Sequence, residues 1–583
     1  MAPTPTKKPG ISSFPEVPVE PIQATAIVII HPGSMTLRIG RASDSYPHSI
    51  PHVIARPCTN LTVLPHVDPI LVPQVETEPE TIATIEEGCE VVGNLLASCL
   101  TSEGRVRYTF PTDKIHLYNQ HAKPNVLAGS CDLHWTKRSH PHDYIVGEEV
   151  LHLNPSDRYH VHWPIRRGHL NLHPGVGGSL TAVMADLEAI WGTAIQQYLD
   201  IPLKDLKHYR ALLIIPDVYT REHVREMIKV ILFQLGFAAC FVHLESVCAT
   251  FGAGLSYACV VDVGDQKTSV CCVEDGISCR ATRLVMEYGG ADITHLFHYL
   301  LLKNGFPYTE CNYENFPDAM LLQELKESMC HVNLDICGAR ERSFQVKHPS
   351  KPLIEYKIKV GDECLIAPLA LFRPDILGLT GPKQVRVQHR NPGDPEDPHD
   401  ENYLIQTQRR GAREVVDGSQ ASDAASQLDD SQMGQAGLDD DDVVAPEAAS
   451  VASSATMRDN DGEFQCDQLL GIDQAIIQCV DRCDSDDLKR KMFSCILVVG
   501  GGSMFPGIHT WLQNRLSVQI PIMYRAEQID IITRPKEMDP RITTWKGAAI
   551  MSCLDTAQEL WIRQAEWQQL GVRLLRERAP FTW

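Results

Sequence analysis

The sequence has no apolar run that approaches the roughly 20 residues needed to span a membrane. Its start, from Met1 to Pro15, is rich in proline and lacks the apolar core of a secretory signal peptide. Zinc-site spacing is missing as well, because Cys479 and Cys483 have no second cysteine pair to complete a ligand set. These absences argue against a membrane protein, a secreted protein and a metal centre, and they favour the cytosol or the nucleus.

The cysteines themselves are numerous, but their pattern does not predict disulfide bonds. The chain has 19 of them, an odd number, spread through apolar segments such as the one around Cys271 and Cys272. Reduced, buried thiols are therefore expected. Hydrophobic residues make up 43% of the sequence and charged residues 22%, which is typical of folded domains, and 583 residues leave room for about three or four domain-sized units.

Negative charge is concentrated in one stretch. The chain has a formal net charge of −21, and residues 414–463 hold thirteen acidic residues and one arginine, a net −12, which leaves −9 elsewhere. A composition this polar cannot offset the entropy of ordering, so residues about 404–465 are predicted to form a disordered tether. Because the remainder of the chain is only mildly acidic, the overall charge does not exclude contact with nucleic acid.

Three short segments place glycines directly after runs of β-branched residues. Two of them, residues 27–40 and 260–270, predict tight hairpins with a glycine turn. The third, residues 496–507, predicts a strand followed by a glycine run. Such turns direct backbone N–H groups toward one point, so two facing hairpins can hold a polyphosphate while the glycine run lets a nucleotide lie against the backbone. Taken singly, each segment is more typical of an ordinary hairpin between core strands.

In this order, the three turns resemble the nucleotide cleft of the actin, Hsp70 and sugar-kinase superfamily. Residues 367–374 and 545–550 are similar to actin segments that come in the same order. Four segments resemble the nuclear actin-related subunits of chromatin-remodelling complexes almost residue for residue: 31–41, 163–168, 261–276 and 393–401. The resemblance covers about residues 26–583 and implies an α/β, two-lobed actin-like fold with a nucleotide cleft and two family-specific insertions.

The predicted organisation follows this resemblance and the local patterns. A strand at residues 211–215 precedes a helix that starts near Thr220 and ends at Gly236, an alternation typical of an α/β lobe. The expected units are a flexible leader (1–23), a first lobe (24–255) with an insertion of little periodicity (about 58–142), a second lobe (256–540) with the acidic insertion (about 386–466), and a C-terminal segment (541–583) that returns to the first lobe.

The resemblance also implies that the cleft binds ATP. Arg38 stands where the family has a lysine that reaches the phosphates, and its fork of donors suits that purpose. Lys326 and Glu327 match the pair beside the adenine, although they also fit an ordinary solvated helix face, and Arg541 replaces a lysine beside the base. The expected nucleotide-binding residues are Gly33, Ser34, Met35, Arg38, Asp262, Gly264, Asp265, Gln266, Lys326, Glu327, Gly500, Gly501, Gly502, Met504 and Arg541.

The reacting end of the cleft departs from the family at three positions. Of the two acidic residues that hold the waters around Mg²⁺, the second is kept as Asp262, but His31 replaces the first, so Mg²⁺ should be held weakly. Glu245 replaces a glutamine that positions the attacking water, and its charge should repel the phosphates. Ser269 replaces a histidine that helps to position the same water. We therefore expect ATP binding without useful hydrolysis and no catalytic residues; a weak ATPase or a sugar kinase of this superfamily is the alternative.

A hydrophobic groove between the lobes is the other site that the resemblance implies. Its expected residues are Phe251, Gly254, Ile550, Leu554 and Leu560, which by pattern alone are better explained as core. The implied ligand is the long helicase-SANT-associated helix of a remodeller ATPase, bound beside actin and another nuclear actin-related protein. The resemblance further implies a nuclear scaffold that contacts extranucleosomal DNA, nucleosomes and histones and acts in transcription, DNA repair and recombination. A polymerising actin is a third alternative, which the insertions disfavour.

Basic and histidine-rich segments are weaker candidates for function. Candidate phosphate contacts are Arg166, Arg167, Lys204, Lys207, Arg210, Lys489, Arg490 and Lys491, although solvation explains most such runs. Histidines crowd between His134 and His173, including His140, His142, His160, His162 and His169. Because no pair at helical spacing has a third ligand in register, exposed polar surface is expected there instead of a zinc site.

Overall fold

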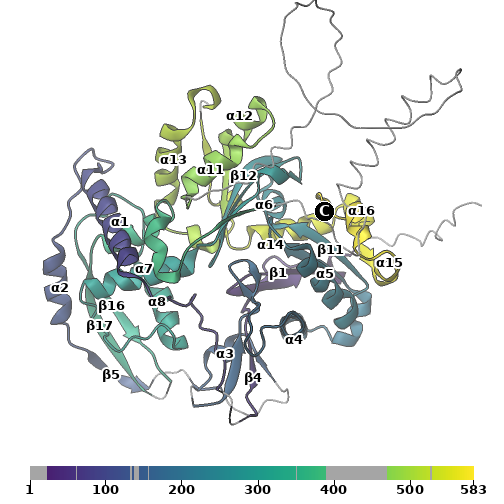
Figure 1. Ribbon diagram of the computed structural model, residues 1–583, viewed down its shortest axis with the longest axis horizontal. Coiled ribbons are helices and arrows are strands. Elements are labelled where there is room, and N and C mark those ends of the chain that lie inside the picture. Colours follow the sequence, from purple (N-terminus) through teal and green to yellow (C-terminus); the bar gives the residue numbers. More distant parts are fainter. Residues whose placement is uncertain are drawn as a thin grey trace, which may run out of the picture. The chain divides into compact units, whose positions relative to one another are not determined.

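The computed structural model describes residues 23–388 and 469–583, apart from residues 61, 63, 131–133, 137–143, 155, 350 and 526–527 (Figure 1). These residues belong to a single folding unit. The expected leader, and nearly all of the acidic insertion with its predicted tether, lie outside the described residues and stay predictions.

The first lobe is built on a six-stranded mixed sheet in the order β21-β11-β10-β1-β2-β3. Its strands are β1 (Ile27–Pro32), β2 (Thr36–Arg41), β3 (His48–Pro51), β10 (Arg210–Ile215), β11 (Ala239–Leu244) and β21 (Ile562–Arg563). β1, β10 and β11 run parallel and are almost wholly buried, as the apolar runs in their sequences require. β21 pairs with β11, so the end of the chain does reach the first-lobe sheet.

The second lobe repeats this arrangement in a sheet of order β18-β15-β13-β12-β19-β20, with β14 paired to β13. Its strands are β12 (Tyr257–Val263), β13 (Thr268–Glu274), β14 (Ile277–Ser278), β15 (Leu284–Met286), β18 (Val385–Val387), β19 (Cys495–Val499) and β20 (Asp530–Ile532). Like β1, β12 has a parallel neighbour on one side and its hairpin partner on the other. Both hairpin turns therefore follow the carboxyl ends of parallel strands, where α/β sheets bind their ligands.

Each lobe also contains helices. In the first lobe these are α3 (Glu148–Leu151), α4 (Leu180–Tyr198), α5 (Arg221–Lys229), α6 (Glu245–Ala253), α14 (Thr543–Ser552), α15 (Gln564–Leu570) and α16 (Leu575–Arg578). In the second lobe they are α7 (Gly290–Lys303), α8 (Phe316–Met329), α9 (Glu363–Leu369), α11 (Ile472–Asp481), α12 (Asp486–Ser494) and α13 (Ile508–Gln519). The helix predicted after Thr220 is α5, which continues as a π-helical turn over Val230–Gln234 and buries its apolar stripe. No helix in the described part of the chain is both long and apolar enough to cross a membrane.

Three small sheets complete the described fold. One contains β4 (Ile54–Pro57), β6 (Ile145–Val146) and β7 (Tyr159–His162), and a second pairs β8 (Ile165–Arg166) with β9 (His169–Leu170). The third has the order β16-β17-β5, with β16 (Arg340–Val346), β17 (Pro352–Val360) and β5 (Asn125–Ser130). β5 comes from the expected first insertion, so this segment extends a sheet that belongs to the second lobe.

The first insertion, expected at about residues 58–142, contains regular structure although its sequence shows little periodicity. The segment forms α1 (Pro79–Ser98) and α2 (Thr112–Gln120) as well as β5. α1 buries Ile85, Val92 and Leu96, a helical stripe, and packs against Pro374–Thr380 of the second lobe. Gly88 allows this close approach, because a Cβ there would overlap the side chain of Ile376. The stripe was hidden by the glycine at its centre and by the acidic residues around it.

Candidate nucleotide-binding site

The two hairpin turns and the glycine run line one cavity of about 690 Å³. In the first turn the Gly33 N–H donates to the Thr36 carbonyl at 3.0 Å, and in the second the Gly264 N–H donates to the Lys267 carbonyl at 2.8 Å. The third segment enters directly from the end of β19. The structure places all fifteen predicted nucleotide-binding residues around this cavity.

Glycine is needed where the third turn meets the second hairpin. Gly500 has a φ of +90°, and a Cβ at this residue would lie 2.5 Å from Oδ1 of Asp262. A Cβ on Gly502 would lie 2.5 Å from the carbonyl oxygen of Gly264. At Gly501, by contrast, the nearest atom would be Cγ of Arg541 at 3.5 Å. The backbones of two turns are thus in direct contact, which leaves a cradle that only side-chain-free residues can form.

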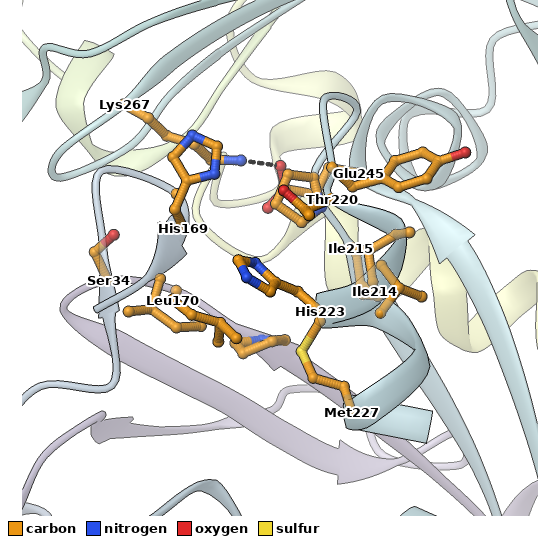
Figure 2. Close-up of a pocket in the computed structure, with 17 residues that line it drawn as sticks. Ser34, His169, Leu170, Ile214, Ile215, Thr220, His223, Met227, Glu245 and Lys267 are labelled. Carbon is orange, nitrogen blue, oxygen red and sulfur yellow. Dashed lines mark hydrogen bonds and ion pairs between the residues drawn. The ribbon is translucent and has the colours of Figure 1, made fainter. Parts of the chain in front are cut away.

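A buried ion pair occupies the phosphate end of the cavity. The Lys267 ammonium, at the tip of the second hairpin, pairs with the Glu245 carboxylate at the start of α6, as Figure 2 shows. Nε2 of His31 lies 3.4 Å from the other carboxylate oxygen of Glu245. Burial by itself raises the pKa of Glu245, but the charge of Lys267 and the contact with His31 outweigh burial and lower that pKa to about 2. Glu245 is therefore ionised and neutralised within the protein.

This geometry corrects the expected role of Glu245. The sequence predicted a free carboxylate that repels the phosphates, whereas the structure supplies a cation for it in Lys267. Sequence reasoning missed Lys267 as a site residue, although it lies in the second hairpin, because the resemblance assigns no function to this position. Ser269, expected beside the reacting water, is 2% exposed and is absent from the lining of this cavity.

Arg38 and Asp262 lie next to this ion pair. Burial lowers the pKa of the Arg38 guanidinium, and the Asp262 charge opposes that shift. The Nε atom of Arg38 is buried and has no hydrogen-bond partner among the described residues. Burial, together with the nearby Glu245 charge, raises the pKa of Asp262 to about 6. A buried cation with an unsatisfied donor is well suited to receive a phosphate oxygen.

Glu245 and Lys267 also line a small chamber of about 50 Å³ (Figure 2). Its lining is mainly apolar, with two imidazoles, from His169 and His223. Burial lowers the pKa of His169 to about 4, so this ring is neutral at physiological pH. Gly168, with a φ of +78°, approaches the Lys267 side chain so closely that a Cβ would lie 2.7 Å from its Cδ. The β8–β9 turn thus holds the lysine stem in place.

At the base end of the cavity, α8 and the segment before α14 supply the polar groups. The Lys326 ammonium is 6% exposed and donates to the Gly290 carbonyl at 2.9 Å, so it does not belong to a solvated helix face. Burial lowers its pKa. Arg541 pairs with Asp539 at 2.7 Å. Asp539 and Gln323 also line the cavity, and no sequence pattern indicated either residue.

Several expected phosphate contacts are engaged elsewhere in the described chain. Both terminal nitrogens of Arg167 donate to the Asp292 carboxylate, at 2.8 and 2.9 Å, and Arg166 donates to the Pro69 carbonyl. Arg210 stacks on Trp561 and Lys491 pairs with Glu274, so these side chains are also structural. Arg166 and Arg167 are therefore held by groups of the protein itself, and their contact with phosphates stays a prediction. Lys204 and Lys207 remain exposed.

The histidine-rich segment is likewise less exposed than expected. His162 is 5% exposed and pairs with Asp186 at 2.9 Å, and His169 lines the chamber described above. His140 and His142 lie outside the described residues. Apolar neighbours therefore turn part of this segment into core, which the sequence pattern did not indicate.

Among described residues, three thiols form the only group with the proximity of metal ligands. Sγ atoms of Cys259, Cys272 and Cys479 lie within 4.8 Å of one another, in the second-lobe core. Contact with neighbouring thiols and burial raise the pKa of Cys272 well above its normal value. Burial also acts to raise the pKa of Cys479, but its contacts with Cys259 and Cys272 outweigh burial and lower that pKa. The interpretation of Cys479 and Cys483 as structural residues stays a prediction.

The predicted groove residues lie on and beside α6 and α14. These two helices cross closely, because Gly252 and Gly547 leave no Cβ between them. Ile550, on α14, is 43% exposed, and Leu554, just beyond the end of α14, is 40% exposed. Phe251 and Leu560 are half-buried against the first-lobe core, and Gly254 is exposed. We call these five residues the α6–α14 surface; its apolar side chains are not all core.

Comparisons with known proteins agree with this architecture. The family model for actin matches residues 22–580, so the chain belongs to the actin family. "Actin-related protein 8" of Homo sapiens is 47% identical over 96% of this chain and 93% of its own, and that of Aedes aegypti is 45% identical over 98% of this chain and 100% of its own. The solved structure "Human actin-related protein Arp8 in its ATP-bound state" has a TM-score of 0.81 and 44% identity, covering 98% of this chain and 100% of that one. The expected α/β actin-like fold and the resemblance to actin-related proteins are confirmed.

Proposed function

We propose that this actin-related protein binds ATP in its cleft, does not hydrolyse it at a useful rate, and serves as a scaffold subunit of a nuclear ATP-dependent chromatin-remodelling complex. The observation that carries the proposal is the phosphate end of the cavity, where Glu245 is held by Lys267 and faced by His31. A carboxylate locked in a salt bridge of this kind does not orient a water molecule as a free amide does.

The cleft residues fit ATP. The glycine cradle around Gly500 and Gly502 leaves room for a nucleotide against the backbone, and the buried Nε of Arg38 awaits an acceptor. The similar human protein was solved in an ATP-bound state. The residues fit Mg²⁺ less well, because His31 stands in place of a carboxylate and Glu245 is already paired.

The scaffold part of the proposal rests on the α6–α14 surface. Ile550 on α14 and Leu554 just beyond its end expose apolar side chains close together in the sequence, which suits the face of an amphipathic helix. The proposed occupant is the helicase-SANT-associated helix of the remodeller ATPase, bound beside actin and another nuclear actin-related protein. Extranucleosomal DNA, nucleosomes and histones are the further proposed partners, with roles in transcription, DNA repair and recombination.

A weak ATPase is the second candidate function, and one observation favours it. The pKa of Asp262 is raised to about 6, so its carboxylate can accept a proton near neutral pH. The purified full-length chain distinguishes the two candidates. If ATP is bound but not hydrolysed, chromatography of the extracted nucleotide yields ATP at close to one molecule per chain. ADP as the main product would favour the ATPase, and no bound or bindable nucleotide would overturn both.

A further inference from the structure

Lys267 is held in a fixed position at the phosphate end of the cavity. Its side chain is 12% exposed, its stem lies against Gly168, and its ammonium pairs with Glu245. An ammonium group has three N–H donors, and the structure gives Nζ one hydrogen-bond partner. Two donors therefore remain for a ligand, on a residue that lines the same cavity as Gly33 and Gly500.

The groups around this ammonium are poorly matched to a divalent ion. Mg²⁺ demands oxygen ligands in near-octahedral geometry and usually keeps several waters. At the first-hairpin position the imidazole of His31 offers nitrogen, and its Nε2 faces Glu245. Both oxygens of Glu245 are engaged, one by Lys267 and one by His31. Of the two carboxylates that the family uses to hold the waters around Mg²⁺, this chain keeps Asp262 alone.

The same groups are well matched to phosphate oxygens. Lys267 and Arg38 are two cations that line the cavity, and each has a donor without a partner. Charge-assisted hydrogen bonds from such groups neutralise phosphates without a metal ion. Glu245, which would otherwise repel the nucleotide, serves to aim the ammonium.

We propose that the Lys267 ammonium takes the place of the divalent cation in this cleft, so that the chain binds ATP independently of Mg²⁺. Lys267 is then a specificity-determining residue for the phosphates, and Glu245 and Gly168 are its positioning residues. This inference rests on the ATP binding proposed above, but it adds a property that ATP binding alone does not require.

Equilibrium binding of ATP to the nucleotide-free full-length chain tests the inference. Calorimetric titration in EDTA and in millimolar Mg²⁺ should give dissociation constants within about 3-fold of each other. A loss of affinity of about 100-fold or more in EDTA would overturn the inference and leave the proposed ATP binding intact. Failure to bind ATP under both conditions would overturn the proposed function itself.

Variants identify the responsible residue. In Lys267→Met/Glu245→Gln both charges are removed together, so no unpaired charge stays buried. Its ATP affinity in EDTA should fall about 30-fold or more, with part of that loss restored by Mg²⁺. Lys303→Met is the matched control, because Lys303 also pairs with a glutamate, Glu86, but lies outside the cavity. A folded double variant that binds ATP in EDTA as tightly as the control would contradict the assignment, and should it fail to fold, the wild-type titration still decides.

Discussion

The cleft and the α6–α14 surface share α6 but use opposite chemistry. At the start of α6, Glu245 is 4% exposed and its charge is balanced by Lys267 inside the protein. At the end of α14, Ile550 and Leu554 leave about two-fifths of their apolar side chains in solvent. In the cleft, the buried charge is paired within the protein. On the α6–α14 surface, apolar side chains stay uncovered by the described chain.

This difference distinguishes a site that binds a small ligand from a surface that binds a partner protein. Charged groups that are paired within the fold pre-organise a site for a small anionic ligand, because no reorganisation is needed when it binds. Exposed apolar side chains gain free energy only when a partner removes them from water. In the proposed function, the nucleotide therefore binds in the cleft and a partner helix binds at the α6–α14 surface.

Two neighbouring glycines provide the largest expected effect on the cleft. In Gly502→Ala the new Cβ would meet the Gly264 carbonyl at 2.5 Å and push two nucleotide-binding turns apart. ATP affinity should fall about 100-fold or more. In Gly501→Ala the nearest atom is 3.5 Å away, so affinity should stay within about 3-fold of wild type. Equal effects of both variants, measured by calorimetry on the folded proteins, would argue against the cradle.

The α6–α14 surface should respond to a charge without loss of fold. Leu554→Asp places a carboxylate where a partner helix would bury apolar surface, so affinity for the remodeller helix should fall about 30-fold. Because Leu554 is 40% exposed, the melting temperature should stay near the wild-type value. Leu570→Asp is the control, since Leu570 is 47% exposed but lies on α15. Wild-type helix affinity of a folded Leu554→Asp protein would exclude this surface.

A buried glutamate outside both regions sharpens the comparison with Glu245. Glu363 is 3% exposed, and burial raises its pKa to about 7, partly opposed by a hydrogen bond from the Gly361 N–H. Between about pH 4.5 and 7 the folded chain holds a proton that the unfolded chain has released, so this residue lowers stability as pH rises through that window. Glu363→Gln should stabilise the protein above pH 7 by about 2 kcal/mol and not at pH 4.5. Denaturant unfolding at both pH values measures this, and a pH-independent effect would contradict it.

The smallest expected effect is at the base end of the cleft. The Arg541 side chain is 54% exposed and pairs with Asp539, so it contributes little desolvated interaction. Arg541→Ala should weaken ATP and ADP binding equally, by about 3-fold. A loss of about 30-fold, or a loss for ATP alone, would show that Arg541 contacts the phosphates instead.

Turns and strands were predictable from the sequence, and charge partners were not. Runs such as 27–30 and 260–263, followed by glycine, fix the hairpins locally, because β-branched residues and turn glycines act over a few residues. The pair of Glu245 and Lys267 joins residues on β11–α6 and on the second hairpin, and only the tertiary fold brings them together. The apolar stripe of α1 was missed for a different reason. Gly88 stands where this helix packs most closely, so a glycine replaces an apolar side chain in the middle of the stripe.

Exposure was the other property that local pattern could not supply. Leu554 and Leu322 are both apolar residues in or next to helices, but one is 40% exposed and the other 1% exposed. Similarly, Arg167 and Lys204 are both basic, yet Arg167 forms an ion pair with Asp292 whereas Lys204 is exposed. Whether a side chain is exposed and free to bind a partner depends on the elements packed around it. Sequence periodicity does not report this packing.

The central claim, ATP held without turnover, is tested most directly by single-turnover hydrolysis. The nucleotide-free full-length chain is loaded with less than one equivalent of γ-labelled ATP, with and without Mg²⁺, and released phosphate is followed beside actin under the same conditions. The account predicts that labelled ATP stays intact, with phosphate release at least about 10-fold slower than from actin. Release at the rate of actin would show that the Glu245–Lys267 pair does not disable the cleft and would contradict the account.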